Sequence, residues 1–331
     1  MTDTEPLLAT ARTAVAEAMG VARVIQGRIK ESPGLVKSDR SPVTIADFAV
    51  QALICLRLRA MLGRFLLVGE ESAELLRSEA GAAVREAVTT TVRIVWPGIT
   101  PGEVLAAIDS GAHDATAPAY WTLDPIDGTK GFLRGGQYAI SLAFIEDAQV
   151  TVGVMGCPNL SRDFGRSFAD PDPVGLLYYA SRVGGAWVST PDGVASGGTA
   201  VRCGTSEGPI RVCESVESGH SKQDATARVI AVLGGAGTPA RLDSQCKYAV
   251  VARGQADAYL RLPTRADYVE NIWDHAAGML VAAEAGAEIT DIDGRPLDFS
   301  CGKGLSRNRG ILCASPRFHA RVFDAIRVIN P

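Results

Sequence analysis

Residues 121–132 read Trp121-Thr122-Leu123-Asp124-Pro125-Ile126-Asp127-Gly128-Thr129-Lys130-Gly131-Phe132. In this stretch, two carboxylates three positions apart flank a proline, and a Gly-Thr pair follows them directly. Because proline lacks a backbone donor and fixes φ, these residues cannot form the middle of a helix. We expect a strand over residues 120–123 that breaks at Asp124 and leaves both carboxylates facing one place from a rigid turn.

The residue types in this turn suit a hard divalent cation. Mg²⁺ prefers oxygen ligands and leaves its other positions to water and to substrate phosphate. Asp124 and Asp127 would supply carboxylate oxygens, and a kink could expose the carbonyl of Ile126 as one more. The alternative is an ordinary turn at the end of a strand, because Asp, Pro and Gly are common turn residues.

The composition is that of a globular protein, and the length favours two lobes. The chain has 331 residues, of which 47% are hydrophobic and 21% charged. A formal net charge of −4 gives no support for a nucleic-acid polymer or an anionic membrane as partner. No apolar run approaches the ~20 residues of a membrane span, and the N-terminus lacks the order of a secretory signal.

Cysteine usage indicates the compartment. Seven cysteines are scattered along the chain, and no C-x-x-C pair occurs among them. An odd number without close pairing fits reduced thiols better than a disulfide framework or a zinc knuckle. We therefore expect a cytoplasmic protein.

Hydrophobic periodicity predicts alternating helices and strands, which favours an α/β layered architecture. The expected helices cover residues 6–29, 47–62, 225–233, 244–252 and 273–285. The expected strands cover residues 64–68, 138–144, 150–155, 175–180, 185–188 and 257–262. We interpret residues 73–118 as an irregular surface excursion with helical pieces, interrupted at Trp96-Pro97-Gly98. Near Cys157 we expect the boundary between an N-terminal α+β lobe with the metal site (1–157) and a C-terminal α/β lobe (158–331).

Three further acids stand at the ends of predicted elements. Glu70 follows an apolar strand and a glycine, at the carboxyl end of a strand where α/β proteins build sites. Asp47 and Asp274 lie in the first turns of predicted helices. Each of the three also has a structural explanation, because acids at a helix start act as caps or complement the helix dipole. Element ends are, however, places where distant segments can converge.

Four blocks together resemble the inositol monophosphatase superfamily. They are Val43-Thr44-Ile45-Ala46-Asp47, Gly69-Glu70-Glu71-Ser72, Asp124-Pro125-Ile126-Asp127-Gly128-Thr129 and Trp273-Asp274-His275-Ala276-Ala277-Gly278. The resemblance implies an αβαβα sandwich of the inositol monophosphatase and fructose-1,6-bisphosphatase type. It also implies a lithium-sensitive phosphatase with two or three Mg²⁺ ions, held by Glu70, Asp124, Ile126 through its carbonyl, Asp127 and Asp274.

A finer resemblance points to the 3′(2′),5′-bisphosphate nucleotidases within this superfamily. Lys130-Gly131-Phe132 is similar to that group, as are residues 214–220, 243–248 and 259–263. The resemblance implies a catalytic set of Asp47, Glu70 and Thr129. The implied contacts to the nucleotide are Gly128, Thr129, His220, Ser244, Lys247, Arg261 and Asp274.

The implied substrate is a small bisphosphorylated nucleotide. Adenosine 3′,5′-bisphosphate would be hydrolysed to AMP and phosphate, with its sulfated relative as a second candidate substrate. An inositol (poly)phosphate 1-phosphatase is the first alternative, and Lys130-Gly131 is the feature against it. A catalytically weak nucleotide sensor is the second, and the complete set of carboxylates with Thr129 speaks against it. We expect a monomer or weak homodimer without nucleic-acid or membrane partners.

Overall fold

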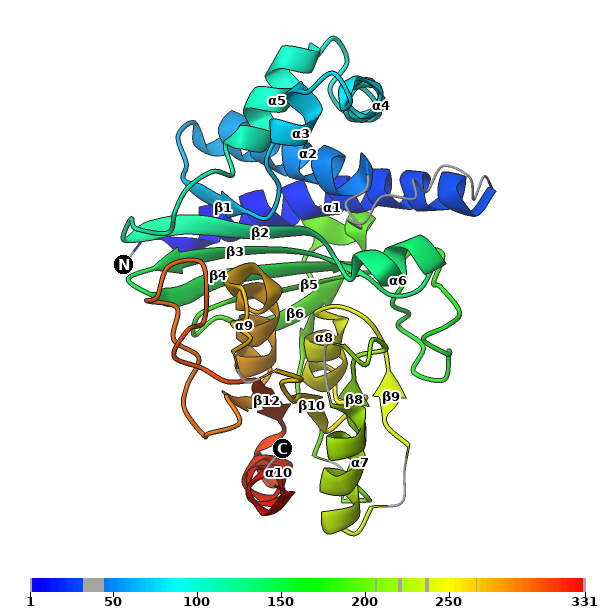
Figure 1. The fold of residues 1–331 in the computed structure, drawn as a ribbon, viewed down its shortest axis with the longest axis vertical. Helices are drawn as coiled ribbons and strands as arrows, with labels where there is room; N and C mark the ends of the chain where they lie inside the picture. Colours follow the sequence, from blue (N-terminus) through cyan, green and yellow to red (C-terminus); the bar gives the residue numbers. More distant parts are fainter. Residues whose placement is uncertain are drawn as a thin grey trace.

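Two β-sheets alternate with three layers of helices, in the order αβαβα that the family resemblance implies (Figure 1). The structure is a computed structural model, and it describes residues 2–31, 45–205, 207–219, 222–235, 238–265 and 267–329. Among these residues, no helix combines the length and apolar character that crossing a membrane requires.

The first sheet has seven strands among the described residues, in chain order across the sheet. They are β1 (Leu67–Gly69), β2 (Ala119–Asp127), β3 (Ala139–Glu146), β4 (Gln149–Cys157), β5 (Leu176–Ser181), β6 (Gly185–Ser189) and β7 (Thr199–Val201). β1 and β2 are parallel, and the other neighbours are antiparallel. The sheet therefore runs past the lobe boundary expected near Cys157, and the division into two lobes stays a prediction.

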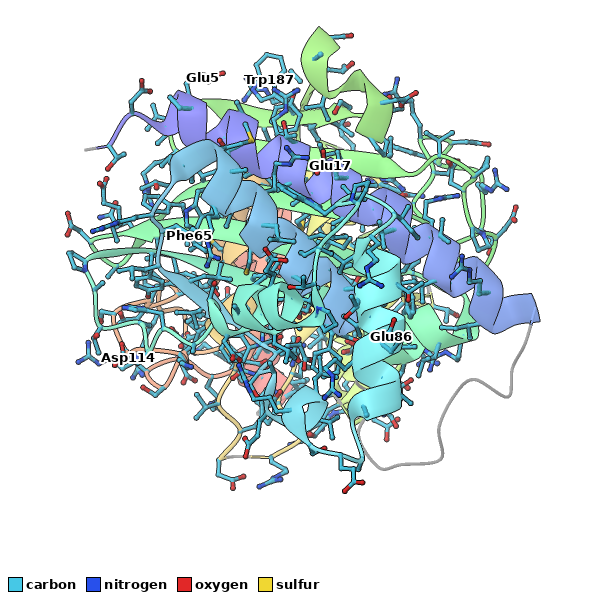
Figure 2. All side chains as sticks on the ribbon, turned by 90° about the horizontal axis from the view of Figure 1, so that it is seen from above. Glu5, Glu17, Phe65, Glu86, Asp114 and Trp187 are labelled. Carbon is cyan, nitrogen blue, oxygen red and sulfur yellow. The ribbon has the colours of Figure 1, made fainter. Side chains whose placement is uncertain are left out.

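Two long helices cover one face of this sheet, where sequence periodicity predicted them. α1 (Thr4–Glu31) and α2 (Ile45–Leu62) lie across the sheet, as Figure 2 shows from above. Their buried apolar side chains join those of the sheet in one core, which includes Val15, Met19 and Leu53. Burial of such side chains supplies the main favourable free energy of folding.

The structure defines the helical pieces that we expected within the surface excursion at residues 73–118. Most of it folds as α3 (Glu74–Arg77), α4 (Ala82–Val92) and α5 (Pro101–Asp109), which lie outside α2 (Figure 1). Val92 and Ile108 are buried in the same core as α2. At the start of α5, Thr100 and Glu103 form a reciprocal capping box. Because these helices are short and a Pro-Gly break separates α4 from α5, hydrophobic periodicity did not give their bounds.

The second sheet has five strands among the described residues, in the order β11-β12-β10-β8-β9. They are β8 (Val212–Glu214), β9 (Ala240–Arg241), β10 (Ala258–Arg261), β11 (Glu288–Thr290) and β12 (Ile311–Ala314). α8 (Cys246–Ala252) and α9 (Ala276–Glu284) fill the layer between the sheets. α7 (Gln223–Val232) and α10 (Pro316–Ile329) cover the outer face.

β2 does not break at Asp124, contrary to the expectation from Pro125. The strand continues to Asp127, but its pairing with β3 shifts, since Asp124 pairs with Ser141 and Asp127 with Ala139. Such an irregularity tolerates proline, because the extra residue needs no ladder hydrogen bond. The rigid kink that the sequence predicts is therefore a bulge within the strand, and it separates the two carboxylates.

The spacing between α8 and α9 depends on a residue without a side chain, and this yields a test. A Cβ on Gly278 would lie 2.3 Å from Cδ2 of Tyr248, whereas a Cβ on Gly27 in α1 would meet nothing within 4 Å. We expect Gly278→Ala to lower the free energy of unfolding by about 1–3 kcal/mol. Gly27→Ala should raise it by about 0.5–1 kcal/mol, because glycine is a poor helix former. Urea unfolding of both variants measures the difference, and equal stability would contradict this packing.

Candidate functional site

The predicted acids converge where β1 and β2 end side by side. The two strands are parallel, Gly69 is in register with Leu123, and the amide of Glu70 lies 3.3 Å from the carbonyl oxygen of Leu123. Glu70 therefore stands beside Asp124. Asp274 reaches the same place from the short 3-10 helix η3 (Ile272–Asp274), which packs on β2.

Three carboxyl groups of this cluster touch one another. Those of Glu70 and Asp124 lie within hydrogen-bonding reach, and so do those of Asp124 and Asp274. Asp127 is close enough that the charge of Asp274 acts on it. Four acids from three separate segments of the chain thus lie close together, and their role as metal ligands stays a prediction.

Burial and mutual repulsion raise the pKa values of these acids. Desolvation and the neighbouring acids Glu70, Asp127 and Asp274 raise the pKa of Asp124 well above its usual value. Desolvation and Asp274 raise the pKa of Asp127 to about 6. Glu70 is exposed as a whole residue, but its carboxyl lies in the crowded part of the site. Desolvation followed by the charge of Asp274 raises its pKa to about 9.

These residues fit divalent cations such as Mg²⁺. Every side chain of the cluster offers oxygen, which Mg²⁺ prefers. Asp124 Oδ1 is buried, and no residue that the structure describes gives it a hydrogen bond. A bound cation would supply the missing partner and remove the repulsion that raises the pKa values. The carbonyl of Ile126 accepts a hydrogen bond of 3.2 Å from Thr129 Oγ1 and retains a second lone pair.

A second acidic group next to this site is an ion-pair network. Glu270, Asp274 and His275 lie close enough together to hold a metal. However, Glu270 already accepts a hydrogen bond from Arg261 and pairs with one ring nitrogen of His275. The other ring nitrogen of His275 forms a hydrogen bond of 2.9 Å with the hydroxyl of Tyr248. With both nitrogens of His275 engaged, we assign Glu270 and His275 to support of the site.

Sequence reasoning missed Gln245, which joins three segments around the acids. Its backbone amide donates to Asp127 Oδ2 at 2.5 Å. Its side chain donates to the carbonyl of Trp273 and accepts from the backbone amide of Gly278. It therefore connects the ends of β2, η3 and α9. Only its place in the nucleotidase-like block 243–248 could have indicated this role.

Gln51 holds the Glu70–Glu71 turn in the same way, and sequence reasoning missed it too. Its side-chain amide donates to the carbonyl of Glu71 at 2.7 Å, and its Oε1 accepts from the amide of Glu71 at 3.1 Å. Gly69 must lack a side chain here, because a Cβ would lie 2.6 Å from Gln51 Oε1. A fully buried glutamine within the apolar helix α2 was the available signal.

Asp47 lies near the acids, although part of its predicted block falls outside the described residues. It is 2% exposed, and its charge contributes to the raised pKa values of Glu70 and Glu71. Val43, Thr44 and His220 lie outside the described part of the chain. A contact between Asp47 and Thr129 stays a prediction.

The helix expected over residues 273–285 is interrupted. Residues 272–274 form η3, and α9 begins only at Ala276, because His275 has a φ of −136° and a ψ of −33°. The interruption places Asp274 in a separate turn, where it meets Asp124.

Glycines bring the second lobe close to β2. Gly128 has a φ of +86°, and a Cβ there would lie 3.1 Å from Cβ of Ser244. Ser244 has a φ of +69°, which is a strained conformation for a non-glycine residue and is typical of functional sites. The predicted ligands Gly128 and Ser244 therefore lie against each other at the end of β2, and their contact with a nucleotide stays a prediction.

Lys247 and Arg261 are the predicted cations of the second lobe, and both are largely buried. Lys247 is 2% exposed, and its Nζ donates to the carbonyl of Ser244 at 2.6 Å. Burial lowers its pKa, which the charge of Asp127 opposes. Arg261 ends β10, and its guanidinium pairs with Glu270 at 2.7 Å.

The Lys130-Gly131 signature contacts Glu217 and Asp243, which lie far along the chain. It lies in α6 (Thr129–Arg134), where Lys130 and Arg134 both pair with Glu217. A side chain at Gly131 would collide, because a Cβ would lie 2.3 Å from the carbonyl oxygen of Gln137 and 2.6 Å from Asp243 Oδ2. The tight approach of α6 to the second lobe explains why glycine stands at this position.

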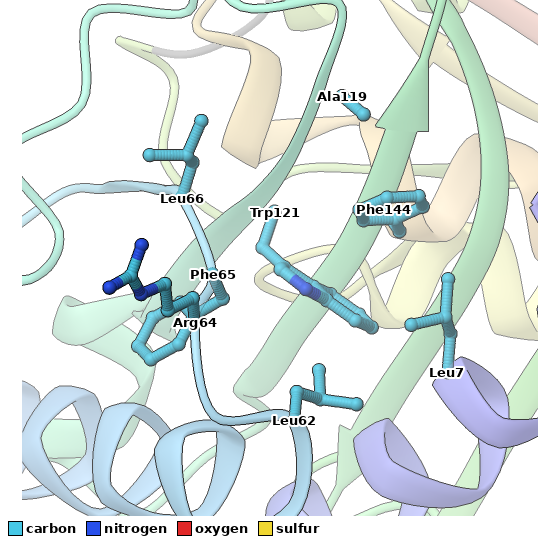
Figure 3. Close-up of a pocket in the computed structure, with 8 residues that line it drawn as sticks. All are labelled: Leu7, Leu62, Arg64, Phe65, Leu66, Ala119, Trp121 and Phe144. Atoms are coloured by element: carbon cyan, nitrogen blue, oxygen red, sulfur yellow. The ribbon is translucent and has the colours of Figure 1, made fainter.

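One cavity lies away from the acids. About 430 Å³ in volume, it is lined by Leu7, Leu62, Arg64, Phe65, Leu66, Ala119, Trp121 and Phe144 (Figure 3). Its lining is mostly apolar and includes no carboxylate. This cavity therefore does not suit a phosphorylated substrate with metal.

Comparison with known proteins agrees with the geometry. A sequence model described as the inositol monophosphatase family matches residues 3–329. A 3′(2′),5′-bisphosphate nucleotidase of Emericella nidulans is 41% identical over 319 residues, which cover 88% of this chain and 90% of that protein. One of Oryza sativa is 38% identical over 343 residues, covering 98% and 95%.

Solved structures share the fold. Inositol monophosphatase from Anabaena superposes with a TM-score of 0.62 at 18% identity, covering 99% of this chain and 97% of that one. The αβαβα architecture is therefore the fold of these proteins.

Repulsion among the acids predicts how stability depends on pH and metal. The carboxyls of Glu70 and Glu71 titrate near pH 9 and 8 in the fold, compared with an ordinary value of 4.5. Between pH 4.5 and these raised pKa values, the folded protein binds more protons than the unfolded chain, so its stability falls as pH rises. We expect the thermal midpoint in EDTA to drop by at least about 2 °C from pH 6 to 8.5.

Mg²⁺ should recover more of this loss at the higher pH, because it binds the ionised carboxylates. A Glu70→Gln/Glu71→Gln double variant is the control and should show a flatter pH dependence. Equal slopes for wild type and control in EDTA would contradict the crowding of these acids.

Proposed function

The chain belongs to the inositol monophosphatase family, and we propose that it is a Mg²⁺-dependent 3′(2′),5′-bisphosphate nucleotidase that hydrolyses adenosine 3′,5′-bisphosphate to AMP and phosphate. The observation that carries the proposal is the position of two buried cations, Lys247 and Arg261, beside a cluster of acids. The names and identities of the relatives support it.

A bisphosphorylated nucleotide matches the two halves of this site. Its scissile 3′-phosphate would lie at the acids Glu70, Asp124, Asp127 and Asp274, together with the Ile126 carbonyl, which would hold two or three Mg²⁺. Its 5′-phosphate would lie at the cations of the second lobe, because arginine and lysine bind phosphate by charge-assisted hydrogen bonds. Gly128, Ser244 and His220 would complete the contacts to the nucleotide.

The chain's own residues would orient and deprotonate the attacking water. Bound Mg²⁺ would neutralise the phosphate and lower the pKa of a water. Thr129, polarised by Asp47, would orient that water by its hydroxyl, and Glu70 would accept the proton. In-line attack then needs no covalent phosphoenzyme.

The free cysteines support the proposed compartment. All seven cysteines of the chain are free, and five of them are buried. Free thiols suit a reducing compartment, so we place the protein in the cytoplasm. We propose a monomer or weak homodimer.

A substrate panel tests the proposed function. We expect phosphate release from adenosine 3′,5′-bisphosphate to exceed that from inositol 1-phosphate and inositol 1,4-bisphosphate, to require Mg²⁺ and to be inhibited by Li⁺. Asp127→Asn should lower kcat by several orders of magnitude with the fold intact by circular dichroism. Preference for an inositol phosphate would replace the proposal with that activity. Binding of the nucleotide without turnover would indicate a sensor.

Thr129 is tested by separating kcat from KM. If its hydroxyl acts on the water, Thr129→Ala should lower kcat and kcat/KM together, by about 10²-fold or more, with little change in KM. Thr129→Ser keeps a hydroxyl and should recover most of the rate. A raised KM with unchanged kcat in the alanine variant would instead move Thr129 to substrate binding.

A further inference from the structure

β10 has a buried carboxylate that binds an arginine in bidentate fashion at each end. Before its first residue, Asp257 binds Arg211 through Nε at 2.9 Å and Nη2 at 2.8 Å. At its last residue, Arg261 binds Glu270 through Nε and Nη2, both at 2.7 Å. The two pairs match in geometry, but Arg211 is 45% exposed while Arg261 is 12% exposed. Only the second pair lies at the candidate site.

Glu270 occupies one edge of the Arg261 guanidinium and leaves the rest for a ligand. A guanidinium has five N–H groups in a rigid plane, and a carboxylate on Nε and Nη2 uses two of them. The second N–H of Nη2 donates to the neutral hydroxyl of Tyr268 at 3.4 Å, so the two donors on Nη1 remain. Arg261 can therefore hold Glu270 and a phosphate at the same time.

Glu270 is itself held rigidly. It is 3% exposed, and its Oε2 pairs with Nε2 of His275 at 3.2 Å. The other nitrogen of His275 bonds the hydroxyl of Tyr248, and both residues are fully buried. A fixed carboxylate fixes the plane of the guanidinium, which matters because bidentate recognition depends on that plane.

The competing partners of Arg261 are the metal-binding acids. Its positive charge already acts on the carboxyls of Asp127 and Asp274. A buried arginine without Glu270 would turn to the nearest carboxylates, because an unpaired buried charge is strongly unfavourable. Arg261 would then compete with the bound metal cations for these carboxylates, and its guanidinium would no longer face the nucleotide. The bidentate pair with Glu270 prevents this exchange.

We propose that Glu270 is a positioning residue that orients Arg261 toward the 5′-phosphate and so makes the enzyme select bisphosphorylated nucleotides. This inference rests on the proposed function. Glu270 touches neither the substrate nor the reacting atoms, and it acts through Arg261. It should therefore affect binding of the second phosphate and leave the chemical step largely unchanged.

The test compares Glu270→Gln with the matched variant Asp257→Asn. For Glu270→Gln, we expect KM for adenosine 3′,5′-bisphosphate to rise by about tenfold or more, with kcat within about threefold of wild type. The dissociation constant of AMP, measured by calorimetry with Mg²⁺ present, should rise by a similar factor. On adenosine 3′-phosphate, which lacks the second phosphate, kcat/KM should match wild type.

Asp257→Asn removes a bidentate pair with an equally buried carboxylate at the other end of the strand, and it should lose stability without changing KM or AMP affinity. If Glu270→Gln does not fold, Glu270→Asp serves instead, because its carboxylate is one methylene too short to hold both Nε and Nη2. Unchanged AMP affinity in the Glu270 variant would overturn the inference. So would a fall in kcat at constant KM, or an equal loss of affinity in Asp257→Asn.

Wild-type behaviour separates this inference from the proposed function. If wild type neither binds AMP nor hydrolyses adenosine 3′,5′-bisphosphate, the proposed function fails, and the inference falls with it. If wild type does both and Glu270→Gln does both equally well, the inference alone fails.

Discussion

Repulsion among carboxylates that share one place is the constraint on which the rest of this structure depends. Glu70, Asp124, Asp127 and Asp274 come from three separate segments. Burial raises the pKa values of all four, and the charges of neighbouring acids add to the shift for Glu70, Asp124 and Asp127. A cluster of this kind is unfavourable by itself, so the surrounding fold must hold it together. The same repulsion gives the site its affinity for divalent cations, since binding them removes it.

The residues around the acids hold the converging segments by hydrogen bonds to the backbone. Gln51 fixes the turn after β1, and Gln245 connects β2, η3 and α9. These glutamines are neutral, so they position acids without neutralising them. The positively charged residues near the acids are held by other partners. Arg261 is restrained by Glu270, and Lys247 is directed to backbone carbonyls. This arrangement leaves the carboxylate oxygens available to cations.

Residue types and the backbone limits set by neighbouring residues made several of the candidate site residues predictable. Asp124 and Asp127 were found because proline and glycine between and after them limit the backbone, and Glu70 because it follows an apolar strand. α1, α2 and β3–β6 follow from hydrophobic period alone. Where elements are short, as in α3–α5, the sequence indicated helical pieces but not their bounds. The prediction was wrong at Pro125, where pairing with β3 continues the strand to Asp127.

The sequence by itself determined which residues could bind metal and phosphate, because residue type and the conformation of neighbouring positions decide that chemistry. Only the tertiary structure decided which of them meet and what supports them. Gln245 bonds Asp127 across 118 positions, and the interruption at His275 that turns Asp274 toward Asp124 breaks an otherwise continuous helical pattern. The pairing of Arg261 with Glu270 instead of an acid of the cluster was equally hidden. Contacts between segments far apart in the chain depend on how the layers pack, and local sequence does not record that packing.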